Sequence, residues 1–343
     1  MRTTERLAGS ACALSMKGDA METSVDSVIL EIKDMSKEFG TVKALKNMQL
    51  AVRPGRVHTI LGENGAGKST LMSILYGFYQ ADQGQIHIHG KQTVIRDSQA
   101  AISLGIGMVH QHFMLVENFT VLENIILGVE GGMLLGRDTD RARAKLQQLQ
   151  KDYGLDVDLD AIIEELPVGR QQRVEILKAL YRGADILILD EPTSVLTPAE
   201  ADHLFEVLRV LREQGKTIIL ITHKLREIMA ITDEVSVMRR GEMVATRTTA
   251  ETTVEELAEL MVGRRVLLHV DKDAARPGPV LLSVKNLTVK DGRGVTMVDD
   301  VSFDVRAGEI VGIAGVAGNG QSELLEAIAG IRKPSSGEIL IDG

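Results

Sequence analysis

Hydrophobic residues in the first 265 positions follow two patterns. Short runs that are apolar on both faces occur at residues 57–61 (VHTIL), 186–190 (ILILD) and 217–220 (TIIL). Such runs are typical of strands in a sheet that helices cover on both faces. Between residues 203 and 214, by contrast, apolar residues recur with the spacing of an amphipathic helix. Buried strands that alternate with amphipathic helices predict an α/β fold.

Two further stretches refine this prediction. Residues 57–79 predict a strand, a glycine-rich loop and a helix in direct succession, and we expect the helix to run from Lys68 through SILYGFY at residues 73–79. Residues 115–165 are mostly helical in pattern. We therefore expect a helical subdomain beside the sheet.

The same order of elements starts again near the end of the sequence. Gly315 lies 315 − 62 = 253 residues after Gly62, and VLLSVKNLTVKD near residue 280 matches VILEIKDMSKEF near residue 28. Between the copies, VDKDAARPGP is charged and ends in Pro-Gly-Pro, which indicates a linker. The predicted organisation is a disordered extension (1–27), a first nucleotide-binding domain (28–265), a linker (266–279) and the N-terminal part of a second such domain (280–343), which we expect to be incomplete.

Composition narrows the class of protein. The net charge of −9 argues against a nucleic-acid-binding protein that neutralises many phosphates. The single cysteine, Cys12, excludes a framework of internal disulfides and fits a reducing compartment. No apolar run approaches the roughly 18 residues of a membrane span, and the apolar part of residues 1–20 is too interrupted for a signal peptide. We expect a cytosolic chain.

Residues 62–70, GENGAGKST, fit the phosphate-loop pattern G-x-x-x-x-G-K-[ST]. The glycines let successive backbone N–H groups face a phosphate, Lys68 reaches the β- and γ-phosphates, and the Ser69 hydroxyl holds Mg²⁺. The alternative is a glycine-rich turn without a ligand. The predicted ATP-binding residues of the loop are Gly62, Glu63, Asn64, Gly65, Ala66, Gly67, Lys68, Ser69 and Thr70.

Three residues at the ends of other predicted strands complete an ATP-hydrolysing site. Asp190 ends a buried strand, where a carboxylate that coordinates Mg²⁺ belongs, and Glu191 follows as a general base for water. His223 follows another buried strand and is a candidate contact for the γ-phosphate. The alternatives are an acidic pair at a strand end and a structural histidine.

Taken together, these motifs resemble those of the ATP-binding cassette (ABC) family, over residues 28–343. VHQHF at 109–113 resembles the family's glutamine loop, which implies that Gln111 lies near Mg²⁺ and on the face that meets a membrane subunit. LPVGRQQRVEILKAL at 166–180 occupies the place of the family signature L-S-G-G-Q, and SVLT follows the second carboxylate. Phe39 stands where the family places an aromatic residue that stacks on adenine; a buried core phenylalanine is the alternative.

The tandem layout with a lysine-free second loop resembles the double-cassette ATPases of sugar and nucleoside importers. Stretches such as HQHFMLVENFTVLENI fit the nucleoside branch better. This resemblance implies a P-loop NTPase fold of the ABC type and an ATP-hydrolysing motor that uses ATP and Mg²⁺. It further implies integral-membrane permease partners, an indirect link to a solute-binding protein, pairing between cassettes, no nucleic acid, and a peripheral place on the cytoplasmic face of the membrane.

This sequence departs from the family pattern in two places, and both departures fall in the same predicted nucleotide site, which two cassettes would form together. In the signature, Pro167, Val168 and Arg170 replace Ser, Gly and Gln; in the second loop, Gln321 replaces the lysine. Because the family pairs its cassettes head to tail, the second loop would face the first signature. We therefore expect one hydrolytic site, with Lys68, Asp190, Glu191 and His223, and one site that mainly holds nucleotide. Without a second signature, this chain should bind Mg-ATP but hydrolyse it poorly.

Other functions fit the sequence less well. A soluble ABC protein without a membrane partner normally has a long charged helical linker between its cassettes, and residues 270–279 are too short for one. In DNA-repair or chromosome ATPases a long coiled coil separates the two motifs, yet only 190 − 68 = 122 residues separate Lys68 from Asp190. A regulatory protein that binds ATP without hydrolysing it remains open because of Pro167.

Overall fold

The computed structural model describes residues 28–111, 113–128, 135–265, 275–316 and 318–342. The chain divides into two compact units, residues 1–266 and 267–343, which are described separately. The predicted extension at 1–27 and most of the predicted linker lie outside the described residues. Within the described residues, no helix is long and apolar enough to cross a membrane.

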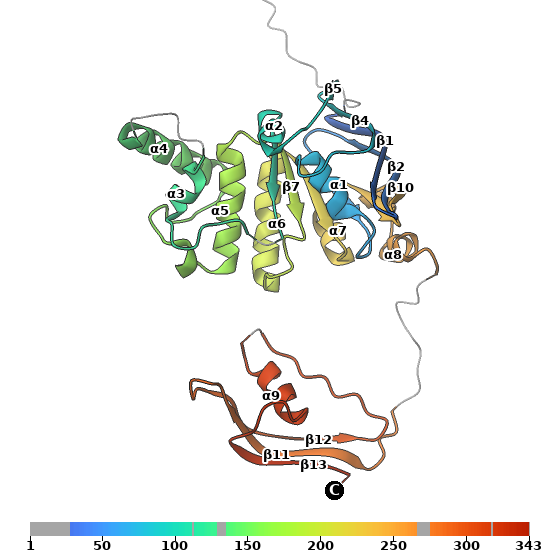
Figure 1. The fold of residues 1–343 in the computed structure, drawn as a ribbon, viewed down its shortest axis with the longest axis vertical. Coiled ribbons are helices and arrows are strands. Elements are labelled where there is room, and N and C mark those ends of the chain that lie inside the picture. The colour runs from blue at the N-terminus through green and yellow to red at the C-terminus, as the bar shows by residue number, and fades with distance from the viewer. Residues whose placement is uncertain (1–27, 112, 129–134, 266–274, 317, 343) are drawn as a thin grey trace, which may run out of the picture. The chain divides into compact units, whose positions relative to one another are not determined.

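A six-stranded sheet forms the centre of the first unit (Figure 1). Five neighbouring strands run parallel and only the edge strand β10 is antiparallel. The carboxyl ends of the parallel strands therefore share one edge, where ligands bind in open α/β sheets. The strand order is β10 (Glu242–Thr248), β9 (Glu234–Arg239), β3 (Val57–Leu61), β8 (Thr217–Thr222), β7 (Ile186–Asp190) and β6 (Ile106–Val109).

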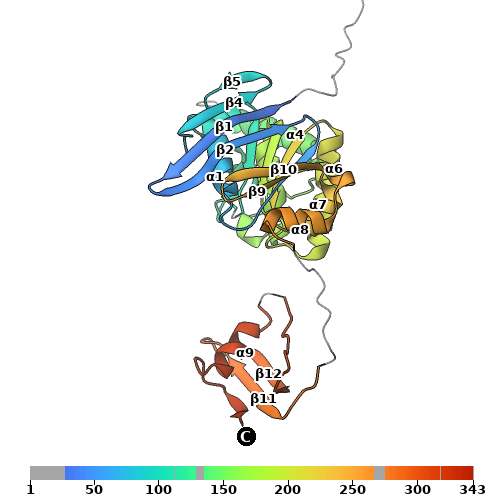
Figure 2. The ribbon, with the colours of Figure 1, turned by 90° about the vertical axis from the view of Figure 1, so that its right-hand side faces the viewer.

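A smaller antiparallel sheet forms a second layer of this unit, drawn in blue to cyan in Figure 2. Helix α1 (Lys68–Leu75) and both sheets share one hydrophobic core, which includes Met35, Met48, Leu71 and Ile219. This core fixes the phosphate loop, which leads directly into α1. The order of the smaller sheet is β2 (Val42–Val52), β1 (Leu30–Phe39), β4 (Gln83–Ile88) and β5 (Lys91–Thr93).

Helices cover the rest of the large sheet. A core that includes Val174, Leu187 and Leu208 joins β7 to α5 (Val168–Tyr181) and α6 (Pro198–Glu213). Helices α3 (Val121–Ile126) and α4 (Leu135–Tyr153) pack on α5 (Figure 1). The predicted α/β class and the predicted helical region are thus confirmed. The remaining helices are α2 (Ser98–Ser103), α7 (Leu225–Ile231), α8 (Val254–Val262) and the short 3₁₀ turns Ile163–Glu165 and Thr249–Glu251.

The predicted helix over residues 68–79 is too long, because α1 ends at Leu75. Gly77 has a φ of +83°, outside the helical region, and a Cβ at this position would lie 2.4 Å from the backbone of Asp97. The glycine thus terminates the helix where the chain passes close to the segment before α2. Phe78 and Tyr79 therefore lie beyond the end of the helix, and both side chains are exposed.

The second unit has a three-stranded antiparallel sheet with one helix packed on it. Residues 309–316, which repeat β3 and its loop, form no strand, and Ile310 is 96% exposed. In the first unit, β3 is held between β8 and β9, which come from residues far along the chain. The described part of the second unit offers no such neighbours. Its elements are β12 (Thr296–Arg306), β11 (Val280–Lys290), β13 (Ser336–Ile341) and α9 (Gln321–Ile328).

Candidate functional site

The phosphate loop connects the fully buried strand β3 to α1. Gly67 caps α1 with a φ of +104°, and a Cβ there would lie 2.6 Å from the carbonyl oxygen of Ala44. A Cβ at Gly62 would lie 2.5 Å from the carbonyl oxygen of Met238. Both glycines are therefore required by close packing. The loop leaves the N-terminus of α1 open, which favours binding of an anion.

Lys68 is buried within this loop. Its Nζ donates hydrogen bonds to the carbonyl oxygens of Gly62 (2.7 Å) and Glu63 (3.0 Å). Burial lowers the pKa of Lys68, although the carboxylates of Glu191 and Asp190 act in the opposite direction. The ammonium group is thus partly deprived of water and faces two acidic residues from the neighbouring loop. The negative charge of a phosphate group would compensate the buried ammonium charge.

Asp190 and Glu191 lie where β7 ends beside the phosphate loop. Burial raises the pKa of Asp190, Glu191 raises it further, and Lys68 opposes the shift. Glu191 has a φ of +43°, an uncommon conformation for a residue with a Cβ. Its backbone N–H donates to the carbonyl oxygen of Ile221 on β8 (2.9 Å), which fixes the turn.

His223 directly follows β8 and contacts Glu191. The imidazole Nδ1 lies 2.9 Å from Oε1 of Glu191. The structure therefore brings together the two residues that the sequence placed at the ends of different strands. The carboxylate orients the imidazole, and the imidazole holds the carboxylate beside the phosphate loop.

One cavity of about 640 Å³ joins most of the predicted residues. Gln111 reaches it from the segment after β6, and Asp190 and Glu191 reach it from the end of β7. Gly62, Glu63, Ala66, Phe39 and His223 do not line it. The lining residues are Val42, Lys43, Ala44, Lys46, Asn64, Gly65, Gly67, Lys68, Ser69, Thr70, Gln111, Asp190, Glu191, Arg240 and Gly241.

The residues of this cavity fit a magnesium ion. Among the described residues, no group of three or more His, Cys, Asp or Glu side chains could hold a metal by itself. Mg²⁺, however, is usually bound by one or two carboxylates together with substrate phosphates. Burial and the nearby Glu191 raise the pKa of Asp190, which a bound cation would offset, and Ser69 and Gln111 line the same cavity, where their side-chain oxygens would add ligands.

Phe39 lies at the end of β1 and is 42% exposed, so it is not a core residue. Its ring meets the Tyr79 ring edge-on, with 5.2 Å between centroids. The ammonium group of Lys37 lies 5.5 Å from the Phe39 centroid. An exposed aromatic face of this kind can stack on a base.

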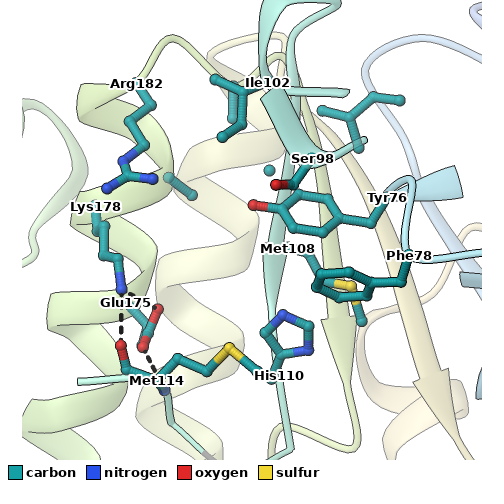
Figure 3. A pocket seen from close by; sticks show the side chains of 14 residues that line it. Tyr76, Phe78, Ser98, Ile102, Met108, His110, Met114, Glu175, Lys178 and Arg182 are labelled. Atoms are coloured by element: carbon teal, nitrogen blue, oxygen red, sulfur yellow. Dashed lines mark hydrogen bonds and ion pairs between the residues drawn. The ribbon is translucent and has the colours of Figure 1, made fainter. Parts of the chain in front are cut away.

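A second pocket, of about 240 Å³, lies beside the segment that carries Gln111 (Figure 3). Tyr76, Phe78 and His110 line one side of it. On the opposite side, buried Glu175 on α5 accepts a hydrogen bond from the Met114 backbone N–H (2.8 Å). Lys178 donates to the Met114 carbonyl oxygen (3.0 Å). Helix α5 thus holds the chain shortly after Gln111, through the backbone N–H and the carbonyl oxygen of Met114.

A helix begins at the altered signature. Pro167 is the N-terminal cap of α5, and its carbonyl oxygen accepts a hydrogen bond from the Arg170 N–H (2.8 Å). Further along α5, the Gln172 side chain donates to the carbonyl oxygen of Pro192 (2.8 Å). This bond ties α5 to the segment that follows Glu191.

In the second unit, Gln321 begins α9 and occupies the position of Lys68. Its amide donates to the carbonyl oxygen of Val316 (3.1 Å), within its own loop. It brings no positive charge to this loop.

Two groups of residues around the first site were not anticipated from the sequence. Lys43, Lys46 and the Arg240–Gly241 turn line the cavity although they lie outside every recognised motif. The other group surrounds buried Glu227. No signal in the sequence could have placed these residues, because tertiary packing brings their segments together. Glu227 accepts hydrogen bonds from the hydroxyl groups of Thr193 and Thr222 and pairs with Lys224.

The architecture and the motifs agree with the comparison to known families. The model of the family described as ABC transporter matches residues 45–194 and 298–343. The chain belongs to the ABC transporter family. Solved cassettes share the fold: a nucleotide-free cassette has a TM-score of 0.59 at 26% identity, covering 69% of this chain and 95% of that chain. The cassette MJ1267 in its ADP conformation has the same score and identity, covering 69% and 99%.

Several relatives are more similar in sequence to this chain than the solved cassettes are. The nucleoside import ATP-binding protein NupA of Lactococcus lactis is 51% identical over 314 residues, and the guanosine import ATP-binding protein NupO of Bacillus subtilis is 51% identical over 315. The ribose import ATP-binding protein RbsA of Caldanaerobacter subterraneus is 42% identical over 316. Each alignment covers 92% of this chain, which spans 62% of NupA and NupO and 63% of RbsA.

Proposed function

We propose that this chain is the ATP-binding part of the motor of an ABC importer. One observation carries the proposal: Lys68, Ser69, Gln111, Asp190 and Glu191 come from three separate loops and line one cavity at the carboxyl edge of the sheet. The import functions named for relatives at 42–51% identity support a transport role. Among the solutes in those names, nucleosides are favoured because NupA and NupO are more similar than RbsA.

Different residues of the site would have different roles in ATP binding and hydrolysis. Backbone N–H groups of the loop and the ammonium group of Lys68 bind the phosphates. Ser69, Gln111 and Asp190 would hold Mg²⁺, which neutralises charge that develops on the phosphate oxygens. Glu191 accepts a proton from the attacking water, and His223 keeps this carboxylate oriented from 2.9 Å. Phe39 stacks on adenine.

Hydrolysis needs a second cassette in this proposal. The family's head-to-tail pairing would place the signature of one cassette over the nucleotide of the other. The solved cassette MJ0796 has been described as dimeric. Pro167 offers neither a hydroxyl nor an N–H to a phosphate, and Gln321 carries no charge. We therefore propose one hydrolytic site at Lys68 and one site that mainly holds nucleotide.

We propose that a membrane permease docks on the face that contains Gln111 and the pocket of Figure 3. Movement of this segment would be passed to α5 through Glu175 and Lys178, which hold Met114. The chain would then lie on the cytoplasmic face of the membrane, and a solute-binding protein would act through the permease.

Nucleotide titration of the 343-residue chain tests the proposal. Removing the ammonium group in Lys68→Ala should weaken Mg-ATP binding by about 10- to 100-fold, since a charged hydrogen bond contributes about 1.5–3 kcal/mol. Calorimetry at neutral pH measures the affinity. Lack of ATP binding by the unaltered chain, or equal binding by the variant, would exclude the motor.

A nucleotide-binding regulator without hydrolysis is the second candidate, and Pro167 is the observation that favours it. Glu191→Gln separates the two in an assembly with a complete second cassette. A motor loses turnover and keeps ATP, whereas a regulator shows no turnover to lose. The isolated chain should hydrolyse ATP slowly if it is a motor and not at all if it is a regulator, and robust hydrolysis that Glu191→Gln abolishes would contradict the pairing requirement.

A further inference from the structure

A two-residue turn joins β9 to β10 beside the phosphate loop. Arg239 pairs with Glu242, so that Arg240 and Gly241 form the turn, with φ values of +52° and +83°. Two positive φ values define a type I′ turn, which favours asparagine, aspartate or glycine at its first position. An arginine there is unusual and carries a conformational cost. Among the described residues, the non-glycine residues with positive φ are mostly Asp or Asn, and the longer ones are His89, Glu191 and Arg240.

The turn is fixed to the phosphate loop by backbone contacts. The Gly241 N–H donates to the carbonyl oxygen of Ala66 (2.9 Å), and the Lys46 N–H donates to the carbonyl oxygen of Gly241 (2.8 Å). A Cβ at Gly241 would lie 2.8 Å from the carbonyl oxygen of Ala44. The side chain of the preceding residue, Arg240, therefore starts from a rigid base and lines the same cavity as Lys68.

Arg240 differs from the other cations of this cavity in its charge partners. Lys43 pairs with Glu38 at 3.3 Å, and Lys46 pairs with Glu242 at 3.5 Å. Lys68 donates to two carbonyl groups. Arg240 is exposed, and its side chain makes no hydrogen bond or ion pair with any residue that the structure describes. Its guanidinium group is thus free to meet an anion in the cavity.

We propose that Arg240 is a further nucleotide-binding residue, whose guanidinium group contacts the phosphates of the nucleotide held by the first loop. The planar fork of N–H donors matches the geometry of phosphate oxygens. Strain at the first turn position is retained where a functional group needs that position. This inference rests on the proposed function, because it requires a nucleotide in the cavity. It adds to Lys68 a cation without a charge partner, from the turn between β9 and β10.

The test is competition of ATP, ADP and AMP against a fluorescent ATP analogue on the 343-residue chain with Mg²⁺. Arg240→Gln should weaken ATP by about tenfold, ADP by less and AMP by less than twofold, because the lost contact is to phosphate. Arg240→Lys should recover part of the affinity, since it restores the charge without the fork. Arg141→Gln removes an exposed arginine on α4 that does not line the cavity, and should change nothing.

Arg240→Gly controls for folding, because glycine suits the positive φ. It should melt at or above the temperature of the unaltered chain and still bind ATP about tenfold more weakly. Unchanged ATP binding by Arg240→Gln, or an equal loss for all three nucleotides, overturns the contact with phosphate. If Lys68→Ala abolishes binding while Arg240→Gln does not weaken it, only this inference fails. If the unaltered chain binds no ATP, the proposed function fails with it.

Discussion

Lys68 and Asp190 are charged residues that the fold partly withdraws from water. Burial lowers the pKa of Lys68 and raises the pKa of Asp190, so burial disfavours the charged form of each. They partly compensate each other, yet both shifts remain. A site of this kind loses stability without its ligand and gains it when nucleotide and metal bind.

Asp190→Asn should therefore stabilise the nucleotide-free chain at neutral pH. The folded pKa of Asp190 is raised above its unfolded value of 3.8, so the folded state binds more protons between the two values and stability falls as pH rises through this window. The substitution should raise the free energy of unfolding on the order of 1 kcal/mol at pH 7, a figure kept small by partial solvent screening. Thermal unfolding measures it.

The gain should disappear below the unfolded pKa, where both states carry a neutral carboxyl group. Asp185, just before β7, provides the control, because its carboxylate is exposed and pairs with Lys216. Asp185→Asn should give no stabilisation at either pH. A stabilisation by Asp190→Asn that persists unchanged at low pH would contradict an origin in its ionisation.

Loops and helix ends hold the segments around Glu191 in place. Glu227 ties the segment after β7 to the segment after β8, because it accepts hydrogen bonds from Thr193 and Thr222. Gln172 on α5 fixes Pro192. Helix α6 follows this segment and starts with a reciprocal hydrogen-bonded cap between Thr197 and Glu200. Each of these bonds restricts how far Glu191 can move.

The cap of α6 allows a prediction. Thr197→Ala should lower the free energy of unfolding by about 1 kcal/mol, since it removes the hydroxyl that caps the Glu200 N–H. Thr197→Ser keeps the hydroxyl and should lose less than half of that. Urea unfolding compares the two variants. Equal stability of the alanine and serine variants would show that the hydroxyl contributes nothing.

This cap also depends on pH. Hydrogen bonds from the Thr197 backbone and hydroxyl lower the pKa of Glu200 below 4.5. Its contribution to stability is therefore present above pH 4.5 and is lost as pH falls through the folded pKa. The difference between the alanine and unaltered chains should shrink in the same range.

The two compact units differ in the size of their cores. The first contains two large clusters of buried side chains on either side of the six-stranded sheet. In the second, the buried cluster is small and comprises Val284, Leu287, Val289, Val298, Leu324 and Ala327. Because stability grows with buried apolar area, the second unit should be the less stable one.

Hydrogen exchange followed by mass spectrometry tests this difference. Amides of β3 and β8, which are buried in the large sheet, should exchange at least about tenfold more slowly than those of β11, the central strand of the second unit. Peptides from α8 serve as an internal reference within the first unit. Equal or slower exchange in β11 would show that the small core makes the second unit as stable as the first.

The sequence alone predicted the α/β class, the helical region and the phosphate loop, because these depend on periodicity and local spacing. It overextended α1, because the turn at Gly77 is set by close approach to Asp97. The repeat itself agrees with the family match, which covers residues 298–343. Residues 309–316 nevertheless form no strand, because a strand needs neighbours to satisfy its backbone and the described second unit has none for this segment.

The sequence by itself thus determined which residues can bind phosphate or metal and the order of their motifs, because a glycine loop, a lysine and a strand-end carboxylate each act through local chemistry. Only the folded chain decided which side chains share a cavity. Asp190 and Gln111 meet the loop because parallel strands end at one edge. Arg240 joins them because a hairpin far along the chain packs against Ala66. Distances between segments that are remote in sequence are set by packing, which no local pattern encodes.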